Sequence, residues 1–395
     1  MKIKGVEAVT FIIDNGFIKT INVNSQSFNL ALQIMIIGYL FKVSAAPFHS
    51  KYLFTSQIIF PSYFLVRKEQ RPILVSGQRA HSTLANSAHS TQKLDPYFIT
   101  GLVDGEGYFC IKICKYSRSK LGWQANGVFG IGLHKKDRAI LELIQQYFNG
   151  IGNINKHGKN SIQYQVRSMK DLAVIIDHFD KYPLITQKRA NFELFKQAFE
   201  LISRKEHLTK EGLTKILGIK ASVNNGLSDD LKASFPNIVP VARPQVELPT
   251  YINPYWLAGF TSGEGCFFVS YSQSSSYKFG HRVQLSFRLS QHSRDAQLMK
   301  SLVQHFGCGI YYPRSNRNEG EFMASALSDV LEYIIPFFEK YPIVGVKNLD
   351  YLDFCKVAKI MKESKHLTRE GLEEIKAIKA GMNSRRVKSL TSQAY

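Results

Sequence analysis

The feature that most constrains this fold is an internal repeat within its 395 residues. The segment 94–109, LDPYFITGLVDGEGYF, returns at 252–267 as INPYWLAGFTSGEGCF. Two more landmarks follow in the same order and at nearly the same spacing, Lys-Tyr-Pro at 181–183 and 340–342, and His-Leu-Thr-Lys/Arg-Glu-Gly-Leu at 207–213 and 366–372. A spacing shared by three landmarks indicates a duplicated domain, and two copies indicate a pseudo-symmetric pair and not a solenoid.

Each copy has the periodicity of an αββαββαα unit. A short apolar helix is expected at 96–105 and again at 254–263, because proline stands in the first turn and glycine near the end. Alternation then predicts two strands, with Phe109, Ile111 and Ile113 on the inward face. A helix, two shorter strands and two or three helices follow, the first three at 137–148, 151–157 and 161–167 in one copy and at 295–306, 309–314 and 321–325 in the other.

The repeat divides the chain into parts. We expect one domain at 94–221 and a second at 253–386, joined by a linker at 222–252 that is rich in proline. Residues 1–93 form an N-terminal extension, and residues 387–395 form a short tail. The predicted fold class is therefore α+β, with two pseudo-symmetric domains.

The charge of the chain points to the kind of partner it binds. The sequence has 51 Lys and Arg against 31 Asp and Glu, a net charge of +20, which favours nucleic acid first and an anionic membrane surface second. With 44% hydrophobic and 21% charged residues, the composition excludes collagen-like, coiled-coil and disulfide-scaffold classes. The 5 cysteines include no C-x-x-C pair, so we expect free thiols and no zinc site.

The predicted opening helix ends in Gly-Glu-Gly in both copies. Gly101 and Gly105 are four residues apart, as are their equivalents in the second copy, and small residues at that spacing let helices approach closely. If the copies pack through these faces, Glu106 and Glu264 lie side by side. Two adjacent carboxylates are either a liability or a divalent-metal site, and such oxygen donors suit Mg²⁺ and phosphodiester chemistry. A single Gly-x-Gly turn with an acid is more often a helix cap or a loop, so the duplication carries the argument.

The stretches TGLVDGEG at 100–107 and AGFTSGEG at 258–265 resemble the two signature motifs of a single-chain, two-repeat LAGLIDADG homing endonuclease. KYPLITQK at 181–188 and GFTSGEGCFFV at 259–269 resemble the branch found in fungal mitochondrial group I introns. The similarity covers about residues 94–386. It implies two αββαββα domains in a monomer, whose sheets form a β-saddle over double-stranded DNA.

The resemblance also implies a metal site at the ends of the signature helices. By motif match, Glu106 and Glu264 hold Mg²⁺ against the scissile phosphates, and the main-chain carbonyls of Gly105 and Gly263 are their neighbours. Asp104 has a serine as its equivalent in the second copy, so it is left out of this site.

Members of the family also carry a basic or amide residue near the active site in each half. Lys188 and Lys347 end equivalent stretches of the two copies and are the candidates. Gln291 fits such a position as well, although its equivalent is Leu133. For these three residues, a structural role as a helix-end cation or a strand-end amide is as good an interpretation as a catalytic one.

Polar side chains on the outward face of the predicted strands are interpreted as DNA contacts. Arg, Lys, Gln and Asn can make bidentate contacts to base edges in the major groove, whereas the alternative is a solvated sheet face. Because the sets of the two copies differ, the target is expected to be long and asymmetric. The first set is Lys112, Gln124, Asn126, Asn155, Gln163, Gln165 and Arg167, and the second is Ser270, Ser272, Arg282, Gln284, Arg288 and Arg314.

The extension at 1–93 lies outside the repeat. Residues 28–41 are mostly apolar but too few for a full membrane span. The stretch GYLFKVSAAPFH at 38–49 resembles a membrane segment of NADH dehydrogenase subunit 2, which implies an exon-derived piece followed by a linker. A coincidental apolar helix is the alternative. If the extension is retained, it is the part expected to contact a membrane.

These observations favour a site-specific, metal-dependent endonuclease that makes a double-strand break to initiate intron homing in the mitochondrial matrix. The alternative is an intron-encoded maturase that binds its own intron RNA and assists group I splicing. A non-catalytic DNA-binding protein is a third class. The presence of both glutamates favours cleavage, because splicing or binding alone needs no paired metal ligands.

Overall fold

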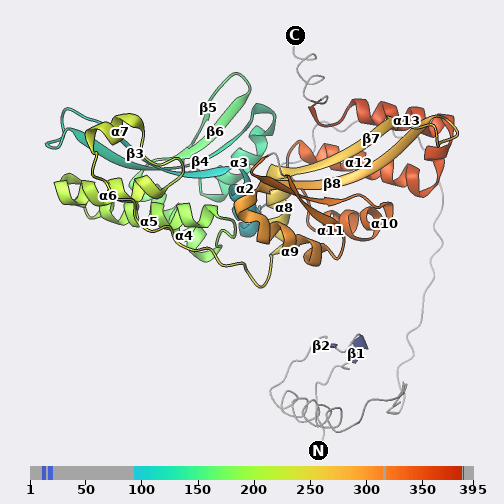
Figure 1. The fold of residues 1–395 in the computed structure, drawn as a ribbon, viewed down its shortest axis with the longest axis horizontal. Coiled ribbons are helices and arrows are strands. Elements are labelled where there is room, and N and C mark those ends of the chain that lie inside the picture. The colour runs from blue at the N-terminus through green and yellow to red at the C-terminus, as the bar shows by residue number, and fades with distance from the viewer. Residues whose placement is uncertain (1–10, 15–16, 21–92, 315–316, 385, 387–395) are drawn as a thin grey trace, which may run out of the picture. The chain divides into compact units, whose positions relative to one another are not determined.

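The computed structural model describes residues 11–14, 17–20, 93–314, 317–384 and 386 (Figure 1). The chain forms two compact units, Met1–Thr83 and Leu84–Tyr395. In the first unit, β1 (Phe11–Asp14) pairs antiparallel with β2 (Phe17–Thr20). The apolar stretch at 28–41 lies outside the described residues. None of the helices in the described part of the chain has both the length and the hydrophobicity that a bilayer span requires.

The first repeat forms the elements that its periodicity predicts. Its opening helix, α2 (Pro96–Glu106), is capped by the Asp95 side chain, which accepts a hydrogen bond of 2.8 Å from the Tyr97 amide. A four-stranded antiparallel sheet of order β3-β4-β6-β5 follows, with helices after it. The elements are β3 (Gly107–Lys115), β4 (Trp123–His134), the 3-10 turn η1 (Lys135–Asp137), α3 (Arg138–Tyr147), β5 (Asn153–Lys156), β6 (Ser161–Val166), α4 (Met169–Lys181), α5 (Lys188–Ser203), η2 (Glu206–Leu208) and α6 (Lys210–Ser222).

The second repeat has the same order, with the sheet β7-β8-β10-β9. It differs where the first repeat has the continuous helix α4. There the second repeat has a π-helical turn η4 (Val330–Ile334), because Pro336 has no amide hydrogen to continue an α-helical ladder. Its elements are α8 (Pro254–Glu264), β7 (Gly265–Gln273), β8 (His281–His292), η3 (Ser293–Asp295), α9 (Ala296–Phe306), β9 (Ile310–Arg314), β10 (Glu319–Ala324), α10 (Leu327–Asp329), η4, α11 (Ile335–Lys340), α12 (Lys347–Lys362), η5 (Lys365–Leu367) and α13 (Arg369–Ala380).

Each sheet buries one face against helices of its own repeat. Phe109, Ile111 and Ile113 of β3 are buried, as the alternation predicts, and α5 packs against them. The Phe109 ring lies 5.5 Å from the Phe195 ring of α5. In Figure 1, α4, α5 and α6 lie on one side of the first sheet. The opposite face of the sheet therefore remains open to a partner.

The two repeats meet through α2 and α8, which stand together between the sheets in Figure 1. A Cβ atom at Gly101 would lie 1.9 Å from the Trp256 carbonyl oxygen, and one at Gly259 would lie 1.9 Å from the Phe98 carbonyl oxygen. The helices thus touch backbone to backbone, in a reciprocal pair of contacts. The predicted packing through the glycine faces is confirmed.

The segment 222–252 has more structure than a covalent linker needs. It contains α7 (Asp229–Ser234), and the Phe235 ring beyond this helix lies 5.2 Å from the Trp123 ring of β4. Arg243 donates hydrogen bonds to the Gln187 carbonyl at 3.0 Å and to the Asn191 side chain at 2.7 Å. The segment is therefore fastened along the first repeat before it reaches the second.

We expect Gly101→Ala to destabilise the protein by at least about 3 kcal/mol, because the added methyl overlaps a backbone carbonyl that cannot move alone. Gly132→Ala is the matched control, since a Cβ atom there meets nothing within 4 Å. Chemical denaturation of both variants measures the difference. A Gly101→Ala protein as stable as the control would contradict the close contact.

Candidate functional site

Glu106 and Glu264 are the last residues of α2 and α8. Because the helices touch along their glycine faces, each glutamate lies over a glycine of the other helix. A Cβ atom at Gly105 would be 3.2 Å from Glu264 Cγ, and one at Gly263 would be 3.0 Å from Glu106 Cγ. The structure therefore brings the two acids together, as predicted from the duplicated motif.

Both carboxyl groups lie in a poor environment for a negative charge. Burial raises the pKa of Glu106, and the neighbouring Glu264 charge raises it further. Burial also raises the pKa of Glu264. Lys188 and Lys347 oppose both shifts, but among the described residues no hydrogen bond or ion pair reaches either carboxylate. A bound cation would relieve this unfavourable charge.

Two lysines lie beside the acids, each at the first position of a helix. Lys188 begins α5, and its Nζ donates to the carbonyls of Val103 at 2.8 Å and Gly105 at 2.9 Å. Lys347 begins α12, and its Nζ donates to the Gly263 carbonyl. The equivalent lysines of the two repeats thus reach equivalent carbonyls at the ends of α2 and α8.

Both lysines are partly buried. Burial lowers the pKa of Lys188 to about 8, although Asp104, Glu264 and Glu106 attract its charge. Burial likewise lowers the pKa of Lys347. A lysine in this state can release or take up a proton near neutral pH, which an exposed lysine cannot do.

The donor set of the site suits a hard divalent cation. Two carboxylates and the carbonyls of Gly105 and Gly263 are all oxygen donors, which Mg²⁺ prefers. Each carbonyl accepts a lysine hydrogen bond in this structure and has a second lone pair. Among the described residues, no group of three or more His, Cys, Asp and Glu side chains could hold a metal, so side chains alone form no complete coordination shell.

Asp104, which is not among the predicted metal ligands, makes other contacts. It is buried, and its carboxylate accepts hydrogen bonds from the Ile185 amide at 3.0 Å, the Thr186 hydroxyl and the Trp256 indole at 2.7 Å. The bond from Trp256 joins the two repeats, whereas the other two lie within the first repeat. The equivalent Ser262 accepts a hydrogen bond of 3.3 Å from the Val344 amide.

Gln291 lies at the end of β8, where its side-chain oxygen accepts a hydrogen bond of 2.8 Å from the His292 amide. Two residues before it, Leu289 pairs with Gly265, which follows Glu264. The strand register therefore brings Gln291 towards the second acid. In the described part of the chain no hydrogen bond joins it to either glutamate or to either lysine.

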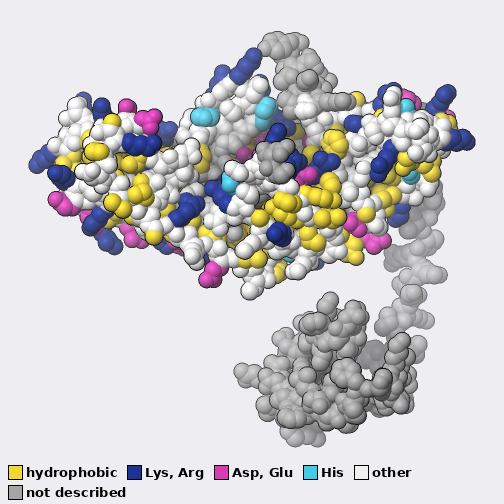
Figure 2. All heavy atoms as spheres, in the orientation of Figure 1, with side chains coloured by type: hydrophobic (Ala, Val, Ile, Leu, Met, Phe, Trp, Pro, Cys, Tyr) yellow, Lys and Arg dark blue, Asp and Glu magenta, His cyan; other side chains and the backbone are white. Residues whose placement is uncertain are grey.

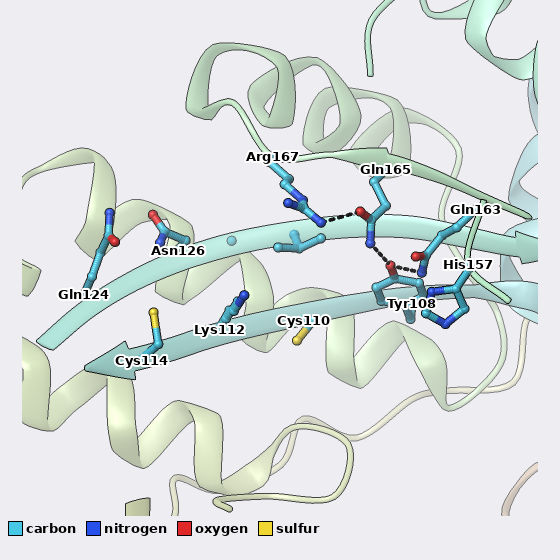
Figure 3. A pocket seen from close by; sticks show the side chains of 12 residues that line it. Tyr108, Cys110, Lys112, Cys114, Gln124, Asn126, His157, Gln163, Gln165 and Arg167 are labelled. Carbon is cyan, nitrogen blue, oxygen red and sulfur yellow. Dashed lines mark hydrogen bonds between the residues drawn. The ribbon is translucent and has the colours of Figure 1, made fainter. Parts of the chain in front are cut away.

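The predicted contact residues of the first repeat share the open face of its sheet. Lys112 pairs with Asn126, and Asn155 pairs with Gln163. Figure 3 shows the groove on this face, which has a volume of about 490 Å³. Apart from Asn155, every residue of the first predicted set lines it, together with Tyr108, Cys110, Cys114, Gly127, Val128 and His157.

A network centred on a hydroxyl and two amides orders one end of this groove. The Tyr108 hydroxyl accepts hydrogen bonds from the amides of Gln163 and Gln165, the latter at 2.7 Å, and Arg167 donates to Gln165 at 2.5 Å (Figure 3). Tyr108 and His157 are not among the contact residues predicted from the sequence. Tyr108 has the outward parity of Lys112, which is the signal that could have found it.

The second repeat orders its open face with charge instead. Ser270 pairs with Gln284, and Ser272 pairs with Arg282. The buried Glu321 forms ion pairs with Arg314 and, at 4.0 Å, with Arg288. Glu321 is not among the residues predicted from the sequence, although the alternation of its strand places it on the same face.

A cation–π contact further fixes one of these arginines. The Arg288 guanidinium lies 4.9 Å from the centre of the Phe268 ring on the neighbouring strand. On the molecular face in Figure 2, Lys and Arg side chains are spread over both repeats. Both open sheet faces thus present donors to an anionic partner.

Comparison with known proteins gives matches over the same two segments. A sequence profile of the LAGLIDADG endonuclease family matches residues 99–199 and 257–358. "Probable intron-encoded endonuclease 3" of Neurospora crassa is 43% identical over 289 residues, which are 73% of this chain and 54% of that protein. The chain thus spans about half the length of this relative.

Two further matches extend the comparison. The "Uncharacterized 50.9 kDa protein in ND4 intron 1" of Podospora anserina is 52% identical over 128 residues, 32% of this chain and 28% of that protein. The crystal structure of the I-SmaMI LAGLIDADG homing endonuclease bound to cleaved DNA is 43% identical and superposes with a TM-score of 0.73. That match covers 74% of this chain and 98% of the other.

We expect Glu106→Gln to raise the thermal stability of the metal-free protein at pH 8. Because the pKa of Glu106 is raised in the folded state, its contribution to stability is present below the ordinary carboxyl pKa and is lost as pH rises through the folded-state value. The advantage of the variant should therefore shrink towards pH 4. Each 1 kcal/mol corresponds to a shift of roughly 2–4 °C in the melting temperature.

Glu374→Gln, at an exposed position of α13, is the control for the loss of a carboxylate. Addition of Mg²⁺ should stabilise the unchanged protein more than Glu106→Gln. An equal effect of Mg²⁺ on both proteins would show that Glu106 does not bind the ion.

Proposed function

This chain belongs to the LAGLIDADG endonuclease family, and we propose that it is a site-specific, metal-dependent endonuclease that initiates intron homing by a double-strand break. The observation that carries the proposal is the pair of glutamates at the touching helix ends, each accompanied by a partly buried lysine. Two equivalent sites in one chain fit the two phosphodiester bonds of a double-strand break. Because one chain supplies both sites, we propose that it acts as a monomer.

The glutamates serve this reaction by holding a cation where charge develops. We assign Mg²⁺ to Glu106 and Glu264, with the carbonyls of Gly105 and Gly263 as its neighbours. Bound there, the ion supplies electrostatic stabilisation of the scissile phosphates. The chain itself brings the backbones of the two glutamates together through the contact of α2 with α8.

The lysines are assigned as proton donors. With a pKa of about 8, Lys188 can hold a proton at Nζ while DNA binds and pass it to the leaving oxygen of the phosphodiester bond that breaks. Lys347 takes the equivalent role in the second repeat. Gln291 is assigned as an amide that orients a polar group beside Glu264, with the strand register as support.

The open sheet faces bind the DNA. In the first repeat, we propose that bases and phosphates are contacted by Lys112, Gln124, Asn126, Asn155, Gln163, Gln165 and Arg167. In the second repeat, we propose the same for Ser270, Ser272, Arg282, Gln284, Arg288 and Arg314. Amides dominate one set and arginines the other, which supports a long and asymmetric target.

The names of the relatives support a proposal about the subcellular location of the protein. Their names describe intron-encoded proteins, one of them in an ND4 intron of Podospora anserina. Together with the resemblance to NADH dehydrogenase subunit 2 at 38–49, this supports a mitochondrial intron gene. We therefore propose the mitochondrial matrix as the site of action.

We expect Glu106→Gln and Glu264→Gln each to abolish double-strand cleavage, because the amide keeps the shape of the side chain but loses the charge that holds the cation. DNA binding should persist, since it depends on the sheet faces. The substrate is a duplex selected for cleavage by the unchanged protein from a randomised library. A variant that still cuts both strands at the normal rate would overturn the assignment.

We expect Lys112→Ala and Arg282→Ala each to weaken binding of that duplex by roughly 1–3 kcal/mol, or to relax base preference at one local step. Affinity should fall steeply with salt, because many phosphates are neutralised and counterions are released. Fluorescence anisotropy at several salt concentrations measures both effects. Unchanged affinity and preference in both variants would show that the sheet faces do not contact DNA as proposed.

A further inference from the structure

The two lysine-bearing helices are each anchored by an aspartate from the other repeat. Asp295 of η3 accepts a hydrogen bond of 2.7 Å from the amide of Gln187, the residue before Lys188. Asp137 of η1 accepts one of 2.9 Å from the amide of Val346, the residue before Lys347. The two contacts are equivalent in the repeat, so they cross the interface in both directions.

A carboxylate at the start of α5 or α12 stabilises the N-terminal end of that helix. The first amides of α5 and α12 have no partner within their own helices, and the helix dipole favours a negative charge there. Asp295 is 5% exposed, and one of its carboxylate oxygens has no hydrogen-bond partner. That oxygen forms an ion pair with Arg294, whose Nε lies 3.6 Å away. The buried carboxylate therefore meets the Gln187 amide with one oxygen and the Arg294 charge with the other.

The neighbouring segments allow or support both aspartate contacts. Gly345 has a φ of +90°, and a Cβ atom there would come within 3.0 Å of an Asp137 oxygen and 2.4 Å of Ile140 Cδ1. Glycine thus lets the loop before α12 approach Asp137. On the other side, Arg243 donates to the carbonyl of Gln187, so that this residue is held at both its amide and its carbonyl.

The anchored residues determine where the lysines can reach. Lys188 and Lys347 follow Gln187 and Val346 directly, and each Nζ returns to a carbonyl at the end of α2 or α8. A shift of either helix start would move the Nζ relative to the glutamate beside it. Misplacement of a reacting group by about 1 Å can reduce a rate about 100-fold.

We propose that Asp137 and Asp295 are positioning residues that act crosswise, each holding the lysine of the other repeat in its working place. Neither repeat then has a complete site without the other. The inference rests on the proposed function of the lysines, and it adds two residues to which neither the signature motif nor the DNA-binding faces point.

The test uses the full chain and a duplex obtained by selecting cleavable sequences from a randomised library with the unchanged protein. Each strand carries a different fluorophore, so that the two cleavage rates are measured separately. Lys188→Ala and Lys347→Ala first show which strand each lysine serves. We expect Asp295→Ala to slow cleavage of the DNA strand that Lys188 serves at least about tenfold, which is about 1.4 kcal/mol. We expect Asp137→Ala to slow cleavage of the DNA strand that Lys347 serves. Nicked DNA should accumulate in both cases.

Two further variants separate positioning from general damage. Asp295→Asn should restore most of the rate, because the amide oxygen still accepts the Gln187 hydrogen bond. Gln187→Pro removes the same bond from the donor side at a φ of −59°, which a proline ring accepts, and should slow the same strand as Asp295→Ala. This variant carries the test if the alanine variant fails to fold. Asp230→Ala, at an exposed position of α7, is the control and should leave both rates unchanged.

The outcomes distinguish this inference from the proposed function. If the lysine variants slow neither strand selectively, the proposed role of the lysines fails. If they do, but the Asp295, Asp137 and Gln187 variants slow both strands equally, the aspartates are only structural and the inference is overturned. Slowing of opposite strands by Asp295→Ala and Asp137→Ala supports it.

Discussion

The close contact between α2 and α8 is the constraint on which the rest of this structure depends. Gly101 and Gly259 each face a backbone carbonyl of the opposite helix at a distance that leaves no room for a side chain. This contact places Glu106 and Glu264 over each other's glycines and aligns the two sheets on either side of one seam. Because this contact is made by backbone atoms, the backbone positions from which the two acids extend are held close together.

The two glutamates and two lysines at the contact of α2 with α8 reduce the cost of one another's burial. Burial and mutual repulsion disfavour two carboxylates, and burial disfavours two ammonium groups, yet each kind moderates the cost of the other. Around them, Asp104 joins the repeats through the Trp256 indole, and the aspartates of η1 and η3 anchor α12 and α5. The polar groups at this interface therefore connect the repeats as well as forming the site.

The two repeats are alike in backbone but not in the chemistry of their surfaces. The Asp104–Trp256 hydrogen bond has no reverse counterpart. Ser262, the equivalent of Asp104, has no carboxylate, and Phe98, the equivalent of Trp256, has no indole N–H. One open sheet face is ordered by the Tyr108 hydroxyl and amides, and the other by Glu321 between two arginines. Duplication has kept the site symmetric while the binding faces have diverged.

The sequence by itself determined the repeat, the order of elements, the inward faces of the strands and the pairing of Glu106 with Glu264. These follow from local periodicity and from glycine spacing, which act over a few residues and are repeated. Only the tertiary structure decided that the lysine Nζ atoms lie on the helix-end carbonyls, that the segment 222–252 is fastened to the first repeat, and that Asp137 and Asp295 reach across the interface. No local pattern records such contacts, because they join residues far apart in the chain whose distance depends on how the two repeats dock.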